Sequence, residues 1–245
     1  MSDWLFDLGN SRFKFAPCRD GQPGAAKAIG HVDGAAAEGW QQQLPAGTRA
    51  WVASVAAPGL TDAVLAALSA RFDQVQVVRS QAQCGRLRIA YPQPHKFGVD
   101  RFLALLAAAA EPEPVLIAGV GTALTIDLLD ADGQHRGGRI APSPTVMRQA
   151  LHARAVQLPE TGGDYHEFAI DTEDALASGC DGAAVALIER SLAHATQLLG
   201  GAVSLVIHGG GADALRPLLP QASLRPGLVL EGLAQWAHHH DRASR

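Results

Sequence analysis

Short apolar runs and longer amphipathic stretches alternate along the chain, a pattern typical of mixed α/β proteins. An apolar run at residues 4–6 is followed by a polar turn at residues 7–10, and an alternating pattern resumes at residues 13–16. This order predicts a β-hairpin with Asn10 and Ser11 at its tip. The pattern that follows predicts a buried strand over residues 50–55, a helix over residues 60–72 and a strand over residues 75–78.

A helical pattern over residues 101–110 ends at Glu111, where two nearby prolines prevent its continuation. We expect a boundary between two lobes there, with residues 1–112 in the first lobe and residues 113–245 in the second. The second lobe opens as the first does, with an apolar strand, a glycine turn and another strand, which indicates an internal duplication. Its pattern predicts strands over 115–118, 124–129, 137–142 and 203–207, helices over 145–155 and 174–199, and a glycine-rich turn at 209–211.

The composition favours a globular protein that binds small ligands. Of 245 residues, 47% are hydrophobic and 18% are charged, and the formal net charge is -4. Because the chain has no basic excess to attract nucleic acid or an anionic membrane surface, we expect neither as a partner. The longest apolar run, residues 102–110, is too short to span a bilayer.

The cysteines and the N-terminal residues favour a reducing compartment. Cys18, Cys84 and Cys180 lie far apart without a Cys-x-x-Cys pair, which argues against a disulfide framework or a zinc site. The first residues lack a basic region followed by an apolar stretch, as an export signal would have. We therefore expect a cytoplasmic protein. We also expect the three histidines at 238–240 to form a solvated tail and not a metal site.

The first glycine turn combines groups that handle phosphate. Within eight positions the chain places an acid, a glycine, two hydrogen-bonding side chains and a cation, namely Asp7, Gly9, Asn10, Ser11 and Lys14. Glycine lets backbone N–H groups approach phosphate oxygens, Lys14 can offset their charge, and Asp7 can hold Mg²⁺ directly or through water. From these residues alone, an ordinary Asx-type turn with a solvated lysine remains the alternative.

A second turn of similar kind spans residues 121–127. Thr122 can bond a phosphate, and Asp127 lies two residues beyond Thr125 on the same face of the predicted strand. A hairpin turn that binds nothing is the alternative. The chain has no P-loop motif, and a strand instead of a helix is expected after each turn, which argues against P-loop and Rossmann nucleotide sites.

Asp100 and Arg101 lie at the start of a predicted helix, after a proline-punctuated loop that contains Tyr91. Asp100 could cap this helix, since a carboxylate is favourable at a helix N-terminus. It could instead be the general base that positions and deprotonates an alcohol during phosphoryl transfer, with Arg101 holding an anionic substrate. Both interpretations fit the residues alone.

Five motifs occur in the order and spacing of type III pantothenate kinases, which this chain resembles over nearly its whole length. They are DLGNSRFK at 7–14, Tyr91 and Pro94 leading to GVDR at 98–101, GTALTID at 121–127, GGRIAP at 137–142, and the glycines at 209–211. The resemblance implies an α/β fold of two duplicated actin-like or acetate-kinase-like lobes, with mixed central sheets flanked by helices. It also implies a homodimer that uses ATP to phosphorylate pantothenate to 4'-phosphopantothenate, the first step of coenzyme A biosynthesis.

The resemblance also assigns roles to the motifs. Asp100 is the expected general base, and Asp7 and Asp127 are the expected Mg²⁺ ligands. The first lobe would carry the first phosphate turn and the substrate loop, and the second lobe would carry the second phosphate turn and the glycine-rich nucleotide turn. The expected ATP-binding residues are Asp7, Leu8, Gly9, Asn10, Ser11, Arg12, Phe13, Lys14, Gly121 and Thr122. The expected pantothenate-binding residues are Tyr91, Gly98, Val99, Asp100, Arg101 and Thr172, where Thr172 has helix capping as its alternative role.

Two positions depart from the family pattern. Gly119 stands where many relatives carry an aspartate of a monovalent-cation site, so dependence on K⁺ or NH₄⁺ is not implied. Ser143 replaces the glycine that usually follows Pro142, which changes turn flexibility without removing a charged group, and we expect activity to survive it. The alternative functions are another small-molecule kinase or phosphatase of the same fold, or a non-catalytic nucleotide-binding accessory protein.

Overall fold

Two units, each built around its own β-sheet, make up the computed structural model, which describes residues 2–32, 35–36 and 39–243. The first unit comprises Met1–Pro112, Asp132–His135 and Gly227–Arg245, and the second comprises Glu113–Ala131 and Arg136–Pro226. The chain first passes from one unit to the other after Pro112, the position at which we expected the lobe boundary. The C-terminal segment, which we expected in the second lobe, packs with the first unit.

The first sheet is mixed, with one strand pairing antiparallel on one side and parallel on the other. Its strands are β1 (Asp3–Leu8), β2 (Arg12–Arg19), β3 (Gln22–Pro23), β4 (Lys27–Val32), β5 (Ala35–Ala36), β6 (Gly47–Ser54) and β7 (Phe72–Val77). They follow the order β5-β4-β2-β1-β6-β7, with β3 paired to β2. β1 and β2 form the predicted hairpin with Asn10 and Ser11 between them, so that prediction is confirmed. β6 runs parallel to β1 on its other side.

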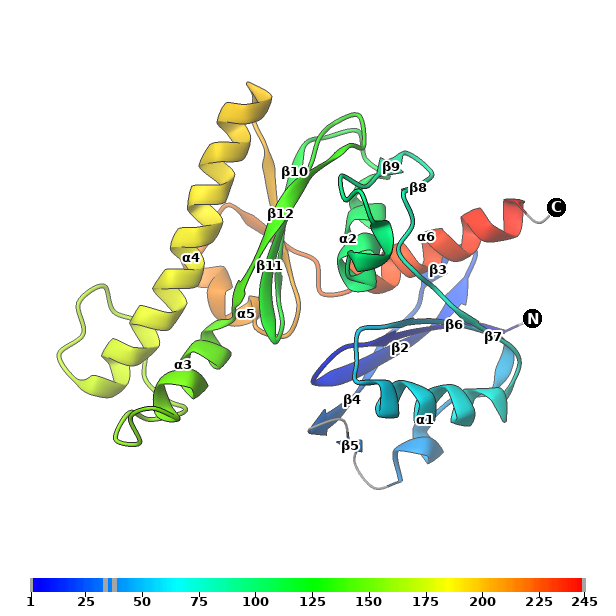
Figure 1. Ribbon diagram of the computed structural model, residues 1–245, viewed down its shortest axis with the longest axis horizontal. Coiled ribbons are helices and arrows are strands. Elements are labelled where there is room, and N and C mark those ends of the chain that lie inside the picture. The colour runs from blue at the N-terminus through cyan, green and yellow to red at the C-terminus, as the bar shows by residue number, and fades with distance from the viewer. Residues whose placement is uncertain (1, 33–34, 37–38, 244–245) are drawn as a thin grey trace. The chain divides into compact units, whose positions relative to one another are not determined.

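Helices cover both faces of this sheet (Figure 1). α1 (Pro58–Ser69) packs its buried side chains on one face, which includes Val52. α2 (Val99–Ala108) and α6 (Leu228–Ala243) lie on the other face, where Trp51, the neighbour of Val52 on β6, meets Trp236 of α6. The two helices approach closely at Gly232, because a Cβ atom there would collide with the carbonyl oxygen of Leu103. The short elements of this unit are η1 (Trp40–Gln43), β8 (Gln83–Cys84), β9 (Leu87–Arg88) and η2 (Pro94–Lys96).

The predicted helix over residues 60–72 is wrong at its C-terminal end. α1 ends at Ser69, and Phe72 is already the first residue of β7. The Phe72 ring is buried and meets the ring of Phe6 edge-on at a centroid distance of 5.8 Å. Packing in the sheet core therefore outweighs the helical spacing of the apolar residues.

The C-terminal helix is tied to the first unit by ion pairs and by ring contacts. Arg49 on β6 pairs with Asp3 on β1 and with Asp241 on α6. The ring of His240 lies 5.5 Å from the ring of Trp51, centroid to centroid. The solvated histidine tail expected from the sequence is therefore wrong for His240, which α6 places against the first sheet.

The second sheet repeats the topology of the first. Its strands are β10 (Val115–Val120), β11 (Ala123–Leu129), β12 (His135–Pro142), β13 (Ser204–His208) and β14 (Ala222–Leu224), in the order β12-β11-β10-β13-β14. As with β1, the first strand β10 lies between an antiparallel hairpin partner, β11, and a parallel strand, β13. The repeat agrees with the duplication inferred from the sequence.

A long helix covers the second sheet (Figure 1). α4 (Thr172–Leu199) buries Ala184 and Ile188 in the same core cluster as Leu116 and Ile126 of the sheet. The remaining helices are α3 (Pro144–His152), α5 (Ala212–Leu215) and η3 (Arg216–Leu218). The side chain of Ser143 accepts a hydrogen bond from the N–H of Val146 and so caps α3.

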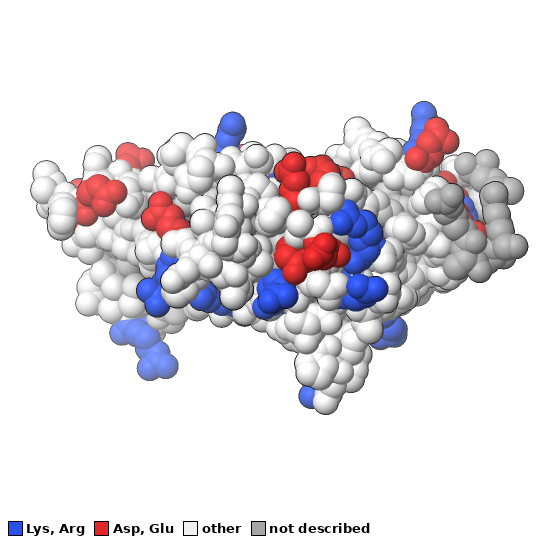
Figure 2. All heavy atoms as spheres, turned by 90° about the horizontal axis from the view of Figure 1, so that it is seen from above, with Lys and Arg blue, Asp and Glu red and all other residues white. Residues whose placement is uncertain are grey.

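Acidic and basic side chains lie among one another on the face drawn in Figure 2.

Within the described residues, none of the helices combines the length and the apolar composition that a membrane span requires.

Candidate active site

The carboxyl ends of β1 and β6 meet at one edge of the first sheet, because the strands are parallel and Leu8 pairs with Ser54. The hairpin turn after β1 lies at this edge. In the turn, the N–H of Gly9 donates to the carbonyl oxygen of Arg12 at 3.1 Å, and a Cβ atom at Gly9 would lie 3.1 Å from the same oxygen. Glycine therefore allows the tight closure of the turn.

The predicted ATP-binding residues of this turn differ in accessibility. Leu8 and Phe13 are fully buried in the sheet core, so any contact they make with a nucleotide uses the main chain. Asn10, Ser11 and Arg12 are exposed. The tip of the hairpin is thus the accessible part of the predicted phosphate turn.

Asp7 lies in an electrostatically crowded place at the end of β1. It is opposite Lys14 in the β1–β2 register, and the carboxylate of Asp100 is close enough to act on it. Burial raises the pKa of Asp7, the negative charge of Asp100 raises it further and Lys14 lowers it, so that the pKa is about 7. Two carboxylates held together at a cost in free energy are typical of a functional site.

Asp100 lies in the first turn of α2, which begins at Val99 after the cap residue Gly98. Its carboxylate accepts the backbone N–H of Arg101 at 2.9 Å, and a Cβ atom at Gly98 would lie 2.6 Å from the same carboxylate oxygen. Asp100 therefore satisfies one N–H of the helix start, as the capping interpretation expects, while its charge also acts on Asp7. A carboxylate has two oxygens, so one contact does not exclude the other role.

Arg101 is buried, and its guanidinium lies over two aromatic rings. Its Cζ atom is 4.5 Å from the ring centroid of Phe97 and 5.9 Å from that of Tyr91. The ring of His135 lies 5.0 Å from the ring of Phe97 and 6.1 Å from that of Tyr91. These contacts restrict the orientation of the planar guanidinium. The structure thus brings together Tyr91 and Arg101, two of the residues that the resemblance assigns to pantothenate binding.

Phe97 and His135 are cluster members that sequence reasoning missed. Phe97 lies between Tyr91 and Asp100 in the predicted substrate loop, so its position in the sequence could have indicated that it belongs to the site. His135 is the first residue of β12, and the segment of residues 132–135 that ends with it belongs to the first unit. No local pattern in the sequence indicates that contact.

In the second unit, the turns after β10 and β13 lie at one edge, again because the two strands are parallel. The N–H of Gly211 donates to the carbonyl oxygen of Val120 at 2.9 Å. Gly209 has a φ of 95°, and a Cβ atom there would collide with the backbone of Val120. Thr122 and Gly121 occupy the adjoining turn between β10 and β11. Both predicted nucleotide turns of this unit are therefore neighbours.

The two expected Mg²⁺ ligands belong to different units. In the first, Asp7 has the carboxylate of Asp100 nearby, and carboxylate oxygens suit Mg²⁺. In the second, Asp127 is only 4% exposed on β11. No cluster of three or more potential metal ligands occurs within the described residues. Mg²⁺ does not require one, since it is usually bound by one or two carboxylates together with substrate phosphates and water.

A side chain at position 119 would require the neighbouring side chains to shift. Gly119 pairs with Thr125 on β11 and with His208 on β13. A Cβ atom at Gly119 would lie 2.7 Å from Oγ1 of Thr125 and 2.8 Å from Nε2 of His208. These two side chains fill the space that an aspartate would need. The residues present therefore do not fit the monovalent-cation site of the family pattern.

Thr172 is the first residue of α4, but it does not cap the helix. The cap is Asp171, whose carboxylate accepts the N–H of Asp174 at 2.9 Å. The alternative role of Thr172 as the cap is therefore wrong. Thr172 lines an open pocket of about 530 Å³ together with Ile170. Ile170 is fully exposed, and nearby Phe168 is 94% exposed.

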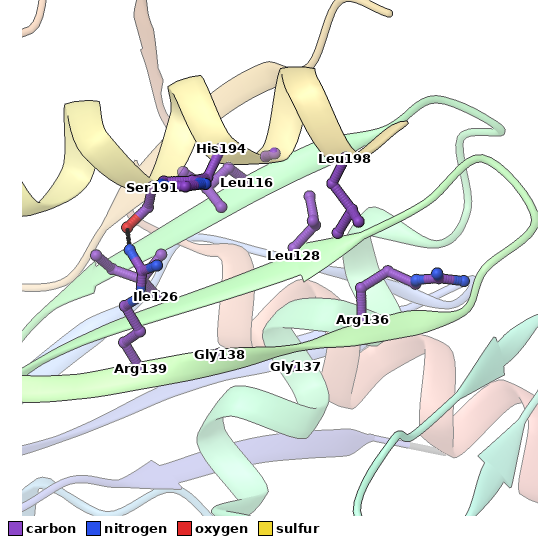
Figure 3. A pocket seen from close by; sticks show the side chains of 11 residues that line it. Leu116, Ile126, Leu128, Arg136, Gly137, Gly138, Arg139, Ser191, His194 and Leu198 are labelled. Atoms are coloured by element: carbon purple, nitrogen blue, oxygen red, sulfur yellow. Dashed lines mark hydrogen bonds between the residues drawn. The ribbon is translucent and has the colours of Figure 1, made fainter. Parts of the chain in front are cut away.

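A second pocket, of about 340 Å³, lies between α4 and the sheet of the second unit (Figure 3). Ser191 points from α4 toward Arg139 on β12 and accepts a hydrogen bond from its guanidinium. Ser191 in turn donates to the carbonyl oxygen of Leu187 at 2.6 Å. Arg139 belongs to the GGRIAP motif, so this motif residue binds a side chain of its own unit. None of the lining residues is one predicted to bind ATP or pantothenate.

Comparison with known proteins decides the family. The family model of type III pantothenate kinase matches residues 4–194. A type III pantothenate kinase of Stenotrophomonas maltophilia strain K279a is 68% identical over 243 residues, which cover 98% of each chain. One from Xanthomonas campestris pv. campestris strain B100 is 64% identical over 239 residues, again 98% of each chain. This chain belongs to the type III pantothenate kinase family. The resemblance inferred from the five motifs is confirmed.

Solved structures confirm the fold expected for a type III pantothenate kinase. A Campylobacter jejuni protein described as a Baf family transcriptional activator has a TM-score of 0.66 at 18% identity, over 98% of this chain and 99% of the other. A ROK family glucokinase from Streptomyces griseus has a TM-score of 0.50 at 13% identity, over 98% and 100%. At these identities the likeness shows the fold alone. The matched family region contains the residues predicted to bind ATP, Mg²⁺ and pantothenate, from Asp7 to Thr172, and the glycine-rich turn at 209–211 lies beyond it.

The substitution Asp7→Asn should raise the free energy of unfolding of the ligand-free protein at pH 8 and change it little at pH 4. The folded protein has a pKa of about 7 at Asp7, above the ordinary value of 3.8 that applies to the unfolded chain. The folded state therefore binds the extra proton between these values, and its stability falls as pH rises through this window. Asparagine carries no charge, so the variant does not lose this stability as the pH rises. Urea unfolding at both pH values measures the difference.

Asp73→Asn is the matched control, because Asp73 is exposed on β7 and the same charge is removed. It should show no comparable difference between pH 4 and pH 8. A lower stability of Asp7→Asn at pH 8 would contradict the electrostatic account of this site.

Proposed function

We propose that the chain transfers the γ-phosphoryl group of ATP to the terminal hydroxyl of pantothenate, which gives 4'-phosphopantothenate and begins coenzyme A biosynthesis. Family membership supports this, since relatives 62–68% identical over nearly the whole chain are type III pantothenate kinases. The structural observation that carries it is the grouping of Asp7 with Asp100 beside the stacked Arg101. The three free cysteines fit a reducing compartment such as the cytoplasm.

Asp100 is the proposed general base. One of its oxygens is held by the N–H of Arg101 at the start of α2, which fixes the direction of the carboxylate. Phosphoryl transfer to an alcohol depends mainly on positioning and on electrostatic stabilisation, and a fixed carboxylate can hold the hydroxyl in line and accept its proton. The neighbouring charge of Asp7 disfavours a second negative charge, which favours binding of a cation at the same place.

The first phosphate turn is the proposed ATP-binding segment of the first unit, and the glycine turns are the proposed ATP-binding segments of the second unit. Exposed main-chain groups at the tip of the hairpin can approach phosphate oxygens, and Lys14 supplies positive charge. Asp7 and Asp127 are the proposed Mg²⁺ ligands. Bound Mg²⁺ offsets the negative charge of the ATP phosphates.

Arg101 is the proposed partner of the pantothenate carboxylate. A guanidinium can donate two parallel hydrogen bonds to a carboxylate, and its stacking on Phe97 and Tyr91 restricts its rotation. Asp100 is the adjacent residue on α2. An anionic substrate bound to Arg101 is thereby held near the proposed base.

A homodimer is the proposed assembly, with Thr172 contacting pantothenate near the subunit contact. The support is apolar surface around Thr172 in the second unit. Phe168 is 94% exposed and Ile170 is fully exposed, and a second copy of the chain would cover them.

Two other functions remain as alternatives. Another small-molecule acceptor would use the same ATP site and the same base, because fold alone does not set the acceptor. A non-catalytic nucleotide-binding protein would keep the phosphate turns without turnover. Acceptor profiling separates the first alternative from the proposal, and nucleotide binding without turnover would indicate the second.

Asp100→Asn should lower pantothenate-dependent ADP release by about 10²- to 10⁴-fold, because asparagine cannot accept the proton. Its side-chain oxygen can still accept the N–H of Arg101, so the start of α2 should persist and ATP binding should survive. The measurement is ADP release from Mg²⁺-ATP with and without pantothenate, together with detection of 4'-phosphopantothenate. Joint loss of turnover and ATP binding would instead assign Asp100 a structural capping role.

Neither K⁺ nor NH₄⁺ should stimulate this reaction, because Thr125 and His208 fill the space beside Gly119. Pantothenate-dependent ADP release should be equal in KCl, in NH₄Cl and in choline chloride of the same ionic strength. Activity that depends on K⁺ or NH₄⁺ would show that the cation binds through other residues.

Ile170→Asp should convert a dimer into a monomer, because it places a charge in the apolar surface proposed for subunit contact. Sedimentation equilibrium of the purified protein measures the change. Leu198→Asp is the control, since Leu198 is also exposed and apolar in the second unit but lies outside the surface around Thr172. A parent protein that sediments as a monomer would contradict the proposed assembly.

A further inference from the structure

His31 lies beside the first phosphate turn, although it belongs to a different part of the chain. It is on β4, which pairs antiparallel with β2 and so runs alongside the residues that follow the turn. Its side chain is only 7% exposed. Neither the motifs nor the proposed mechanism gives it a role.

Two hydrogen bonds connect His31 with the turn. Its backbone N–H donates to the carbonyl oxygen of Ser11 at 3.0 Å, and its ring nitrogen Nε2 lies 2.9 Å from the carbonyl oxygen of Gly9. A carbonyl oxygen can only accept, so Nε2 carries the proton in this contact. His31 thus binds the carbonyl groups of Gly9 and Ser11, on either side of Asn10.

The contact with Gly9 determines where the next amide points. The peptide bond between Gly9 and Asn10 is planar and trans, so the N–H of Asn10 points opposite to the carbonyl of Gly9. By binding that carbonyl from the side of β4, His31 directs the N–H of Asn10 away from β4. Asn10 is exposed, and a turn amide held in one direction can bind a phosphate oxygen.

Packing alone does not account for a histidine at this position. The second ring nitrogen, Nδ1, is buried and has no hydrogen-bond partner among the residues that the structure describes. A buried polar atom without a partner costs free energy, which a leucine would avoid. What histidine supplies and leucine does not is the N–H that binds Gly9.

We propose that His31 is a positioning residue for phosphate binding, whose Nε2–H holds the Gly9–Asn10 peptide so that the N–H of Asn10 meets a phosphate oxygen of a nucleoside triphosphate. The inference rests on the function proposed above for the turn at residues 7–14. His31 acts through the turn and does not itself contact the phosphate. Its loss therefore weakens nucleotide binding more than it slows the chemical step.

A set of substitutions at position 31 separates the hydrogen bond from the volume of the ring. Glutamine offers an N–H near the position of Nε2, whereas leucine and methionine have comparable bulk and no donor. His31→Leu should weaken the binding of Mg²⁺ with the non-hydrolysable ATP analogue AMPPNP about tenfold, as measured by calorimetry. The KM for ATP should rise by a similar factor while kcat stays near the parent value. His31→Gln should return the affinity to within about threefold of the parent.

Ile29→Val is the matched control, because Ile29 is buried on the same strand and contributes to the sheet core. It should lower the thermal midpoint and leave the affinity for AMPPNP unchanged. His31→Met replaces the leucine variant in the comparison if the leucine variant is unfolded at the assay temperature.

A folded leucine or methionine variant that binds AMPPNP as tightly as the parent would overturn the proposal. Equal losses of affinity in the glutamine and leucine variants would overturn it too, because the donor would then be irrelevant. Failure of the proposed function gives a different result, in which the parent binds AMPPNP but releases no ADP with pantothenate, and the affinity comparison at position 31 still decides this inference.

Discussion

Parallel pairing of the first strand in each sheet is the constraint on which the candidate site depends. A parallel pair cannot be closed by a short turn, so the chain must cross over before β6 joins β1 and before β13 joins β10. The carboxyl ends of both strands in a pair then meet at one edge, which is where open α/β sheets bind ligands. The hairpin partner on the other side of β1 or β10 adds a glycine turn at the same edge. Because both sheets have this topology, each sheet has one candidate phosphate-binding edge.

At the first of these edges, the buried carboxylate of Asp7 next to the charge of Asp100 costs free energy and does not stabilise the fold. Burial and the charge of Asp100 raise the pKa of Asp7 to about 7, and Lys14 offsets only part of the effect. A sheet built for stability alone would place neutral groups there. The same reasoning applies to His31, which keeps a buried nitrogen without a partner in the described structure. Binding of a phosphate group and its cation at this edge would explain both the acidic residues and the buried histidine.

The features that could be predicted from the sequence are local ones. The hairpin around Asn10 and the strand and glycine turn after residue 115 follow from alternation and turn chemistry, and the structure confirms them. The two roles of Asp100 could not be separated, because a carboxylate in the first turn of a helix satisfies both. In the structure, the contacts of Asp100 are compatible with the capping role and with the role of general base.

Contacts between distant segments could not be predicted. His135 contacts Tyr91 because residues 132–135, at the start of β12, belong to the first unit. His31 contacts Gly9 because β4 pairs with β2. Spacing along one strand or helix carries no information about which residue of another strand lies opposite. The misplaced end of α1 has a related cause, since the burial of Phe72 in the sheet core determines where β7 begins.

The return of α6 to the first unit has a consequence for how the protein forms on the ribosome. Domains generally fold as they emerge during synthesis, starting from the N-terminus. Here the face of the first sheet around Trp51 is covered by α6, and α6 is made only after the entire second unit. The second unit, from Glu113 to Pro226 except for the short segment at 132–135, can form its sheet while the first unit still exposes apolar surface. The half of the molecule that is translated first is therefore the half that finishes folding last, and in the interval its uncovered face is the part of the nascent chain that most needs protection from aggregation.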